Sequence, residues 1–435
     1  MKKSILSLAS AMLFVFSTNA QKVEFEEYDL DNGLHVILHQ DNSAPVIITS
    51  VMYGVGGKDG DRSRTGFAHF FEHLLFEGTE NIGKGEWFKI VSSNGGRNNA
   101  NTSQDRTYYY EIFPSNKLEL GLWMESERLL HPIIKQEGVD TQNEVVKEEK
   151  RERTRAYSGI LDAISENLFK VHPYKDPNVG YMKDLDAATL EEFLAFNKKY
   201  YVPNNATLVV AGDIDFAATK KMIKDYFGPI PKGAEVVRTF PKEEPITEEF
   251  RATAYDDNIQ IPAVIAAYRT PSFKTRDSKI LDMISTYLSG GKSSVLYKKM
   301  VDTKKMSLAV QAVNISQQDY GIYALFSLPL GDVTLDALIK EMDEEILKIQ
   351  TDLISENDFQ KIQNQFENNY VNSNSNVVGI AGSLASYNVM YGDTNLINSE
   401  IEIYRSVTRE EIREVAKKYL NTNQRLILEY LPKKK

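Results

Sequence analysis

Apolar residues along this chain fall into short continuous runs and into stripes with helical spacing. Strand-length runs rich in β-branched and aromatic residues are Leu34–Leu38, Val46–Tyr53, Tyr108–Phe113 and Thr207–Ala211. Elsewhere apolar positions recur three and four residues apart, which predicts helices at Gly85–Ser93, Leu118–Leu130, Thr141–Tyr157 and Thr189–Tyr200. Strands and helices alternate irregularly, and a hairpin turn, Asp31-Asn32-Gly33, precedes the first run. The pattern therefore predicts an α+β fold with mostly antiparallel sheets packed with helices.

Two segments far apart in the chain share one pattern. Thr189-Leu190-Glu191-Glu192-Phe193 precedes Lys198-Lys199-Tyr200, and Thr408-Arg409-Glu410-Glu411-Ile412 precedes Lys417-Lys418-Tyr419. In each copy the threonine can cap a helix while the glutamate three residues later reaches back to the cap. An apolar run follows both copies, so the repetition predicts two homologous tandem domains.

A proline-rich stretch marks the boundary between these two domains. Pro229, Pro231, Pro241 and Pro245 are separated by charged residues, which is typical of an extended connection. We therefore expect an N-terminal domain over residues 21–230, a linker over 231–247 and a homologous C-terminal domain over 248–435. Both domains then have an ordinary size.

The composition of the chain limits which partners and which metal ligands are expected. The chain of 435 residues has a net charge of −10, which argues against nucleic acid as a partner, because phosphate binding needs clustered lysine and arginine. It has no cysteine, so a metal site must use histidine and carboxylate ligands.

The first residues have the layout of a secretory signal peptide. Lys2 and Lys3 form a basic head, an apolar stretch runs over residues 5–16, and Ala20 ends the segment with a small residue. We expect residues 1–20 to be removed and the mature protein to be soluble and exported, either periplasmic or secreted. The stretch is too short for a stable membrane span, although an uncleaved anchor is the alternative.

The strongest chemical signal is the motif His69-Phe70-Phe71-Glu72-His73 within the helical run Phe67–Phe76. Histidines four residues apart share one helix face, so both imidazoles can reach one metal ion. Glu72 lies beside them and suits a general base that takes a proton from water. A third ligand is needed, and the helix containing Glu148 and Glu149 is the richest source of carboxylates. Spacing alone does not choose between these two, and a solvated helix face is the alternative.

The inverted motif is the hallmark of the inverzincins, and the surrounding sequence resembles the pitrilysin family, which includes insulysin and the mitochondrial processing peptidase. The matching segments are residues 66–79, 95–103, 172–174 and 201–205, together with Gly180. The resemblance implies a zinc-dependent peptidase subunit with one zinc ion per chain.

Residue by residue, the resemblance makes His69 and His73 metal ligands and Glu72 the base. The third ligand falls on Glu149, in a Val-x-x-x-Glu context, with Glu148 as the fallback. The family's Asn-Ala edge strand holds the peptide substrate by strand addition, which implies a substrate-binding role for Asn99, Ala100 and Asn101. A plain edge strand is the alternative.

Two features of the sequence depart from the family pattern. A supporting carboxylate of many relatives is replaced by Gln142. An arginine and a tyrosine that help to stabilise the tetrahedral intermediate fall on Val301 and Leu308, which cannot donate a hydrogen bond to an oxyanion. We therefore expect a half-enzyme that hydrolyses peptides in a closed chamber and needs a homologous subunit bearing the arginine and tyrosine. The alternatives are a homo-oligomer and a non-catalytic peptide-binding or structural subunit.

Overall fold

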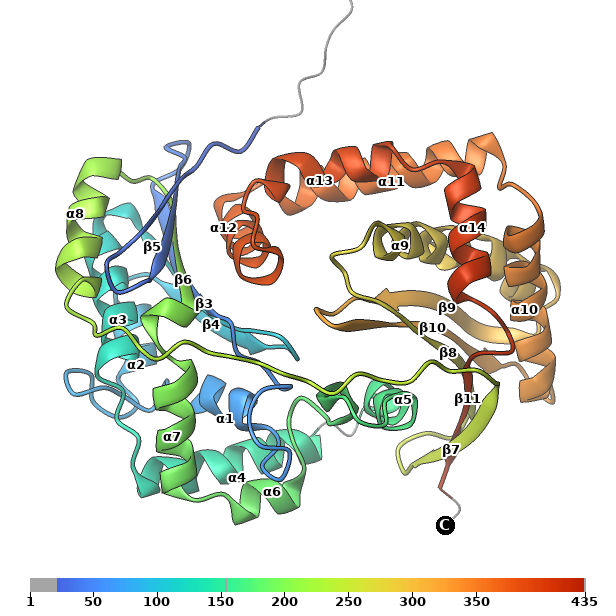
Figure 1. The fold of residues 1–435 in the computed structure, drawn as a ribbon, viewed down its shortest axis with the longest axis horizontal. Helices are drawn as coiled ribbons and strands as arrows, with labels where there is room; N and C mark the ends of the chain where they lie inside the picture. The colour runs from blue at the N-terminus through green and yellow to red at the C-terminus, as the bar shows by residue number, and fades with distance from the viewer. Residues whose placement is uncertain (1–21, 153–154, 434–435) are drawn as a thin grey trace, which may run out of the picture.

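The computed structural model describes residues 22–152 and 155–433 of the chain. The predicted signal peptide, residues 1–20, lies outside the described residues. The described part has two halves, each built from one mainly antiparallel sheet with helices packed on it (Figure 1). The predicted α+β class is therefore confirmed.

The first sheet, within the described residues, has six strands in the order β1-β2-β6-β3-β5-β4. All neighbours are antiparallel except β2 and β6, which run parallel. Its strands are β1 (Glu26–Asp29), β2 (His35–Gln40), β3 (Val46–Tyr53), β4 (Arg97–Thr102), β5 (Thr107–Pro114) and β6 (Ala206–Gly212). Strand β4 forms one edge of this sheet, which leaves its outer side open for a further strand.

The second sheet repeats this topology. Its order is β7-β11-β8-β10-β9, with β7 and β11 parallel and the other neighbours antiparallel. Its strands are β7 (Phe250–Asp256), β8 (Ala263–Pro271), β9 (Ser307–Ile315), β10 (Tyr320–Pro329) and β11 (Leu426–Pro432). If β7 corresponds to β2 and β11 to β6, the two sheets have the same strand order, except that the first sheet has the additional edge strand β1. The two halves are thus copies of one architecture.

The helices of the first half are α1 (Phe67–Leu74), α2 (Trp87–Ser93), α3 (Leu118–Leu130), α4 (Gln136–Glu152), α5 (Ile160–Leu168), α6 (Met182–Ala187), α7 (Leu190–Tyr200) and α8 (Phe216–Phe227). Those of the second half are α9 (Arg276–Ser289), α10 (Leu335–Thr351), α11 (Glu356–Ser373), α12 (Val377–Ser386), α13 (Leu396–Arg405) and α14 (Arg409–Tyr419). Reciprocal capping boxes begin both α7 and α14, at Thr189 and Thr408, as the repeated pattern predicted.

One predicted helix has different bounds. Thr141–Tyr157 was expected, whereas α4 begins at Gln136, and Tyr157 lies in a turn with a backbone φ of 67°. Gly138 in the first turn of α4 lowers the intrinsic helix propensity there, so the sequence pattern hid the true start.

Each half packs one helix onto the sheet of the other half. Helix α12 of the second half covers the first sheet, where Ile380 and Leu384 are buried with Ile48 and Val209. Helix α5 of the first half covers the second sheet in the same way (Figure 1). Because each sheet completes its core with a helix from the other half, the two halves are held in a fixed relation.

A buried ion cluster also joins the halves. The Lys58 Nζ lies 2.9 Å from a carboxylate oxygen of Asp105 in the first half and 2.7 Å from one of Asp319 in the second. The Tyr174 hydroxyl donates to Asp105 and accepts from the backbone N–H of Asp319. A buried charge without a partner is costly, so this cluster adds specificity to the junction.

The expected linker is extended. Residues 228–249, all within the described part, form neither helix nor strand. Arg238 contacts Asp59, and the carboxylate of Glu243 accepts backbone hydrogen bonds at residues 170–172. The domain boundaries stay a prediction.

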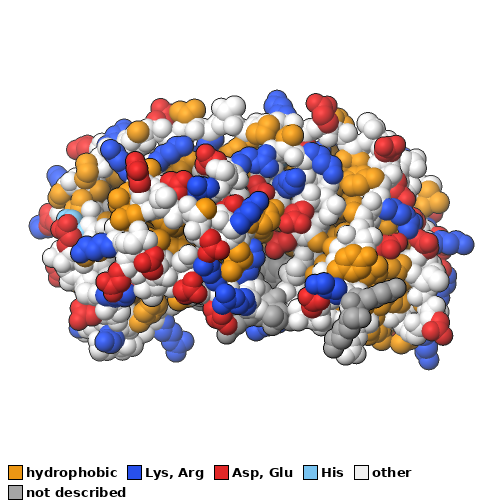
Figure 2. Space-filling model, turned by 90° about the horizontal axis from the view of Figure 1, so that it is seen from below, with side chains coloured by type: hydrophobic (Ala, Val, Ile, Leu, Met, Phe, Trp, Pro, Cys, Tyr) orange, Lys and Arg blue, Asp and Glu red, His pale blue; other side chains and the backbone are white. Residues whose placement is uncertain are grey.

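None of the helices in the described residues combines the length and the apolar character needed to cross a membrane. On the face drawn in Figure 2, lysine and arginine side chains are interspersed with aspartate and glutamate. Such a surface differs from the basic stripe that binds nucleic acid.

Candidate metal site

Helix α1 presents the motif because its other face is aromatic. Phe67, Phe70 and Phe71 are buried, and the rings of Phe67 and Phe70 lie 4.5 and 4.6 Å from the ring of Phe193 on α7. Burying several aromatic rings fixes the rotation of the helix about its axis. The polar motif residues are thereby turned towards α4 and β4.

The first turn of α1 is locked by a close backbone approach. Gly66 has a φ of 86° and Gly180 a φ of 73°, which favour glycine. A Cβ atom at Gly66 would lie 2.7 Å from the Val179 carbonyl oxygen, so a side chain there would clash. The Thr65 hydroxyl donates to Asp184 at 2.6 Å and adds a second tie.

The last turn of α1 is held by two side chains. The Tyr109 hydroxyl donates to the Phe71 carbonyl at 2.8 Å, and the Arg128 Nη1 donates to the Leu75 carbonyl at 3.1 Å. The Phe71 carbonyl also accepts a hydrogen bond of 3.1 Å from the Leu75 N–H, and a cation near a helix C-terminus is favourable. Both ends of the motif helix are therefore fixed by groups from other elements.

Arg128 itself is completely buried. Its guanidinium lies 2.9 Å from Glu111 and 3.2 Å from Glu125, and it stacks 4.0 Å from the Trp87 ring centroid. Burial, followed by the neighbouring Glu125, raises the pKa of Glu111 well above its ordinary value. This buried cluster lies beneath α1 and is tied to its end through Arg128.

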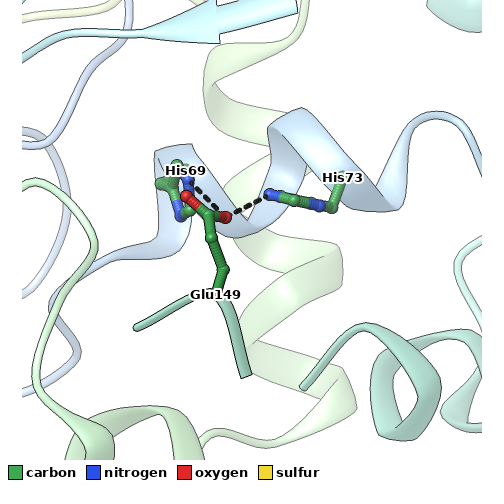
Figure 3. Close-up of side chains that lie close together, drawn as sticks. All are labelled: His69, His73 and Glu149. Carbon is green, nitrogen blue, oxygen red and sulfur yellow. Dashed lines mark ion pairs between the residues drawn. The ribbon is translucent and has the colours of Figure 1, made fainter. Parts of the chain in front are cut away.

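The structure brings His69, His73 and Glu149 together (Figure 3). The Glu149 Oε2 lies 3.5 Å from the His69 Nε2 and 3.3 Å from the His73 Nε2. Two ligands about 2.0–2.1 Å from one tetrahedral zinc ion lie roughly 3.3–3.4 Å apart. Two imidazole nitrogens and one carboxylate oxygen also leave a fourth position open, as catalytic zinc sites do. The donor set fits a zinc ion in its chemistry, and both distances between Glu149 and the histidines match the spacing of zinc ligands.

The neighbouring carboxylates of α4 point elsewhere. Glu148 is exposed and pairs with Arg151 at 2.9 Å, and Glu144 pairs with Lys147 at 3.1 Å. Gln142 donates to Glu77 and contributes no carboxylate. Spacing left the choice between Glu148 and Glu149 open. The geometry favours Glu149 as the candidate ligand, and its role as a ligand stays a prediction.

Glu72 stands beside this donor set and is linked to the edge strand. Its Oε2 accepts a hydrogen bond of 2.7 Å from the Thr102 hydroxyl at the end of β4. Burial raises the pKa of Glu72 above its ordinary value, while the Thr102 hydrogen bond and nearby His73 oppose that shift. A carboxylate with a raised pKa is better matched to proton transfer near neutral pH.

The three residues expected to bind substrate lie on β4, the edge strand of the first sheet. The Asn99 side chain accepts a hydrogen bond of 2.9 Å from the backbone N–H of Ala100, and the Arg106 guanidinium donates to the Asn101 carbonyl at 2.8 Å. A free edge beside Glu72 is suited to strand addition. Substrate contact by Asn99, Ala100 and Asn101 stays a prediction.

A cavity of about 510 Å³ adjoins the end of β4, between the two halves. The first half contributes Thr102, Arg106 and Asn178 to its wall, and the second half contributes Phe273 and Tyr391. Thr102 in this wall contacts Glu72, which does not itself line the cavity.

Several of these residues were not singled out as site residues from the sequence. Thr102 lies in segment 95–103, which resembles the family, but no sequence pattern predicts its contact with Glu72. Arg128 and Tyr109 support the motif helix from other elements, and no local pattern reveals such long-range contacts. Of the residues that depart from the family pattern, Val301 packs partly buried against the core of the second half, and Leu308 is 45% exposed on β9.

Comparison with known proteins decides the family. Residues 35–180 match the family model described as Insulinase (Peptidase family M16). Residues 187–366 match the model of the Peptidase M16 inactive domain. The chain belongs to the M16 peptidases. The predicted relation to the pitrilysin family is thereby confirmed.

The M16 relatives include proteins named as zinc proteases. The chain is 28% identical over 431 residues to Zinc protease PqqE of Helicobacter pylori, covering 97% of both chains. It is 21% identical to the Probable mitochondrial-processing peptidase subunit beta of Arabidopsis thaliana, covering 90% of this chain and 75% of that one.

Solved structures share the fold. A protease from Helicobacter pylori superposes with a TM-score of 0.88 at 26% identity, covering 94% of this chain and 99% of that chain. The periplasmic protease PqqL from Escherichia coli gives a TM-score of 0.76 at 19% identity, and the match covers 93% of this chain but 47% of that one. This M16 chain thus has the length of about half of PqqL.

Proposed function

We propose that this M16 protein is a zinc-dependent endopeptidase subunit that hydrolyses peptides or unfolded polypeptides. The observation that carries the proposal is the convergence of His69, His73 and Glu149 at zinc-ligand spacing, with Glu72 beside them. Zinc proteases among the relatives support the same reaction class.

Each residue would have a distinct task. His69, His73 and Glu149 would hold the zinc ion, which when bound would lower the pKa of a water molecule and polarise the substrate carbonyl. Glu72 would take the proton of the attacking water at one carboxylate oxygen and later pass it to the leaving amine. The exposed edge of β4 would hold the substrate backbone in an extended form beside Glu72.

The proposed site is incomplete for oxyanion stabilisation. Val301 and Leu308 stand where the family resemblance places an arginine and a tyrosine, and neither side chain can donate a hydrogen bond. We therefore propose a homologous partner subunit that supplies both donors and closes the chamber. The half-length match to PqqL supports pairing of two such units. An exported location, supported by the periplasmic PqqL and the N-terminal sequence pattern, belongs to the same proposal.

Peptide cleavage by the purified chain tests the activity. We expect cleavage of a quenched fluorogenic peptide library that requires zinc, is lost on chelation and is highest with the partner present. Glu72→Gln should lower kcat about 10²- to 10⁴-fold while zinc remains bound, because only the base is removed. Glu80→Gln, an equal change of charge at an exposed position nearby, serves as the control.

The second candidate is a non-catalytic peptide-binding or structural subunit. The observation that favours it is the absence of donors at Val301 and Leu308. Cleavage that is unaffected by Glu72→Gln, or no cleavage with any homologous partner despite bound zinc, would favour this role over the peptidase.

A further inference from the structure

One hydrogen bond joins the proposed base to the proposed substrate strand. The Thr102 hydroxyl donates to the Glu72 Oε2 at 2.7 Å. Thr102 is the last residue of edge strand β4, whereas Glu72 lies on the motif helix α1. A side-chain hydrogen bond thus connects the two elements that must cooperate in cleavage.

The position of Thr102 is itself fixed by neighbouring residues. Its neighbour across the ladder is Thr107 on β5, whose hydroxyl donates to the Val55 carbonyl at 2.8 Å. The Thr102 carbonyl accepts a hydrogen bond of 2.9 Å from the Asn178 side chain. Because that carbonyl is already occupied, the free edge of β4 ends at Thr102, beside Glu72.

Glu72 is equally constrained on its own side. The turn that follows it is fixed by Tyr109 and Arg128, which donate to carbonyls of the last turn. With the helix fixed, the remaining freedom of Glu72 is the rotation of its side chain, and the Thr102 hydroxyl selects one rotamer. This hydroxyl occupies the Oε2 atom of the carboxylate and leaves the Oε1 atom for proton transfer.

We propose that Thr102 is a positioning residue for the reaction: its hydroxyl fixes the Glu72 carboxylate relative to the edge strand on which the substrate lies. The position of the base is thereby fixed relative to β4. A substrate that adds to β4 as a strand then brings its reacting carbonyl to a carboxylate that is already oriented. Orientation of this kind accelerates the chemical step rather than substrate binding. The inference rests on the proposed peptidase function.

Two variants separate positioning from packing. Thr102→Val removes the hydroxyl and keeps the branched shape, whereas Thr102→Ser keeps the hydroxyl and removes a methyl group. We expect Thr102→Val to lower kcat about 10- to 100-fold, because a small misplacement of a reacting group costs that much. KM and zinc content should stay close to the wild-type values, and Thr102→Ser should retain kcat within a few-fold.

The opposite pattern would overturn the inference. An unchanged kcat in Thr102→Val would show that the hydroxyl is unimportant. Equal losses in the valine and serine variants, or a change confined to KM, would assign Thr102 to packing or to substrate binding.

Failure of the proposed peptidase function would give a different result from failure of the positioning role of Thr102. In that case the wild type would show no zinc-dependent cleavage with any partner, or Glu72→Gln would remain active. Crystal structures of the two variants then decide the positioning role. A Glu72 carboxylate displaced in Thr102→Val and unmoved in Thr102→Ser would support it, and an unmoved carboxylate in both would refute it.

Discussion

The two halves of the molecule share one strand order, but their corresponding helices carry different polar groups. Helix α1 follows β3 and places two imidazoles and the Glu72 carboxylate near Glu149. Helix α9 follows β8, the corresponding strand, and carries Lys279 and Asp282. In each half a helix carboxylate accepts a hydrogen bond from the edge strand: Glu72 from Thr102, and Asp282 from Asn314 at 2.8 Å.

The polar groups around α9 pair with one another within the second half. The Lys279 Nζ pairs with Glu400 and lies 3.1 Å from the Tyr391 hydroxyl, and the Tyr404 hydroxyl donates to Asp282 at 3.2 Å. A lysine therefore supplies the positive charge that these carboxylates need. Among the described residues, the grouping of three metal-binding side chains occurs in the first half alone.

This difference shows how one architecture can serve two purposes. A buried polar network that contains its own cation stabilises and specifies a fold. A set of two histidines and a carboxylate instead offers neutral and anionic donors that suit an external cation. The match of residues 187–366 to the M16 inactive domain agrees with a structural role for the second network.

The largest effect is expected from a substitution that removes one ligand from the donor set of the first half. Glu149→Gln should weaken zinc binding at least about 100-fold, since a ligand contributes more than the outer-shell groups whose loss costs 10- to 100-fold. Competition with a chromophoric chelator measures the affinity. Glu148→Gln is the matched control on the same helix and should bind zinc normally, because Glu148 pairs with Arg151 at the surface. Equal losses in both variants would contradict the assignment of Glu149.

A second substitution breaks the network of the other half. Lys279→Met should lower the free energy of unfolding by about 3 kcal/mol, because Glu400 would lose the partner of a largely buried ion pair. Zinc affinity should not change. Urea unfolding measures the stability, and Lys348→Met removes an exposed lysine from the same half as a control. A loss of zinc binding in Lys279→Met would show that the second network acts on the first site.

The smallest expected effect concerns pH. Burial raises the pKa of Asp282 from 3.8 to about 6 in the folded protein. The unfolded chain therefore releases this proton first, and the folded state loses up to about 2–3 kcal/mol of stability as the pH rises from 4 to 7. Asp282→Asn lacks this loss, so its stability relative to the wild type should increase over that interval. Urea midpoints at pH 4.5 and 7 measure the difference, and parallel pH profiles would contradict it.

Much of this fold could be predicted from the local sequence pattern. The run Val46–Tyr53 is strand β3, Leu118–Leu130 is helix α3, and the two Thr-x-x-Glu capping boxes begin α7 and α14. These features depend on neighbours along the chain, and the repeated pattern also revealed the duplication. The exchange of α5 and α12 between the sheets could not be predicted, because it depends on how the two completed halves dock.

The candidate site was predictable where one helix carries it. His69, Glu72 and His73 share a face through their spacing alone. Glu149 required the packing of α4 against α1, which sequence spacing leaves open. Thr102 and Arg128 were missed because their contacts with α1 join residues 30 and 53 positions apart.

The most direct test of the account is anomalous X-ray diffraction at the zinc edge from crystals of the mature chain grown with zinc. The account predicts one strong peak within bonding distance of the His69 Nε2, the His73 Nε2 and a Glu149 carboxylate oxygen, and no peak beside Lys279 and Asp282. A peak absent from the first half, or bound in the second, would contradict the claim that only the first half holds the metal.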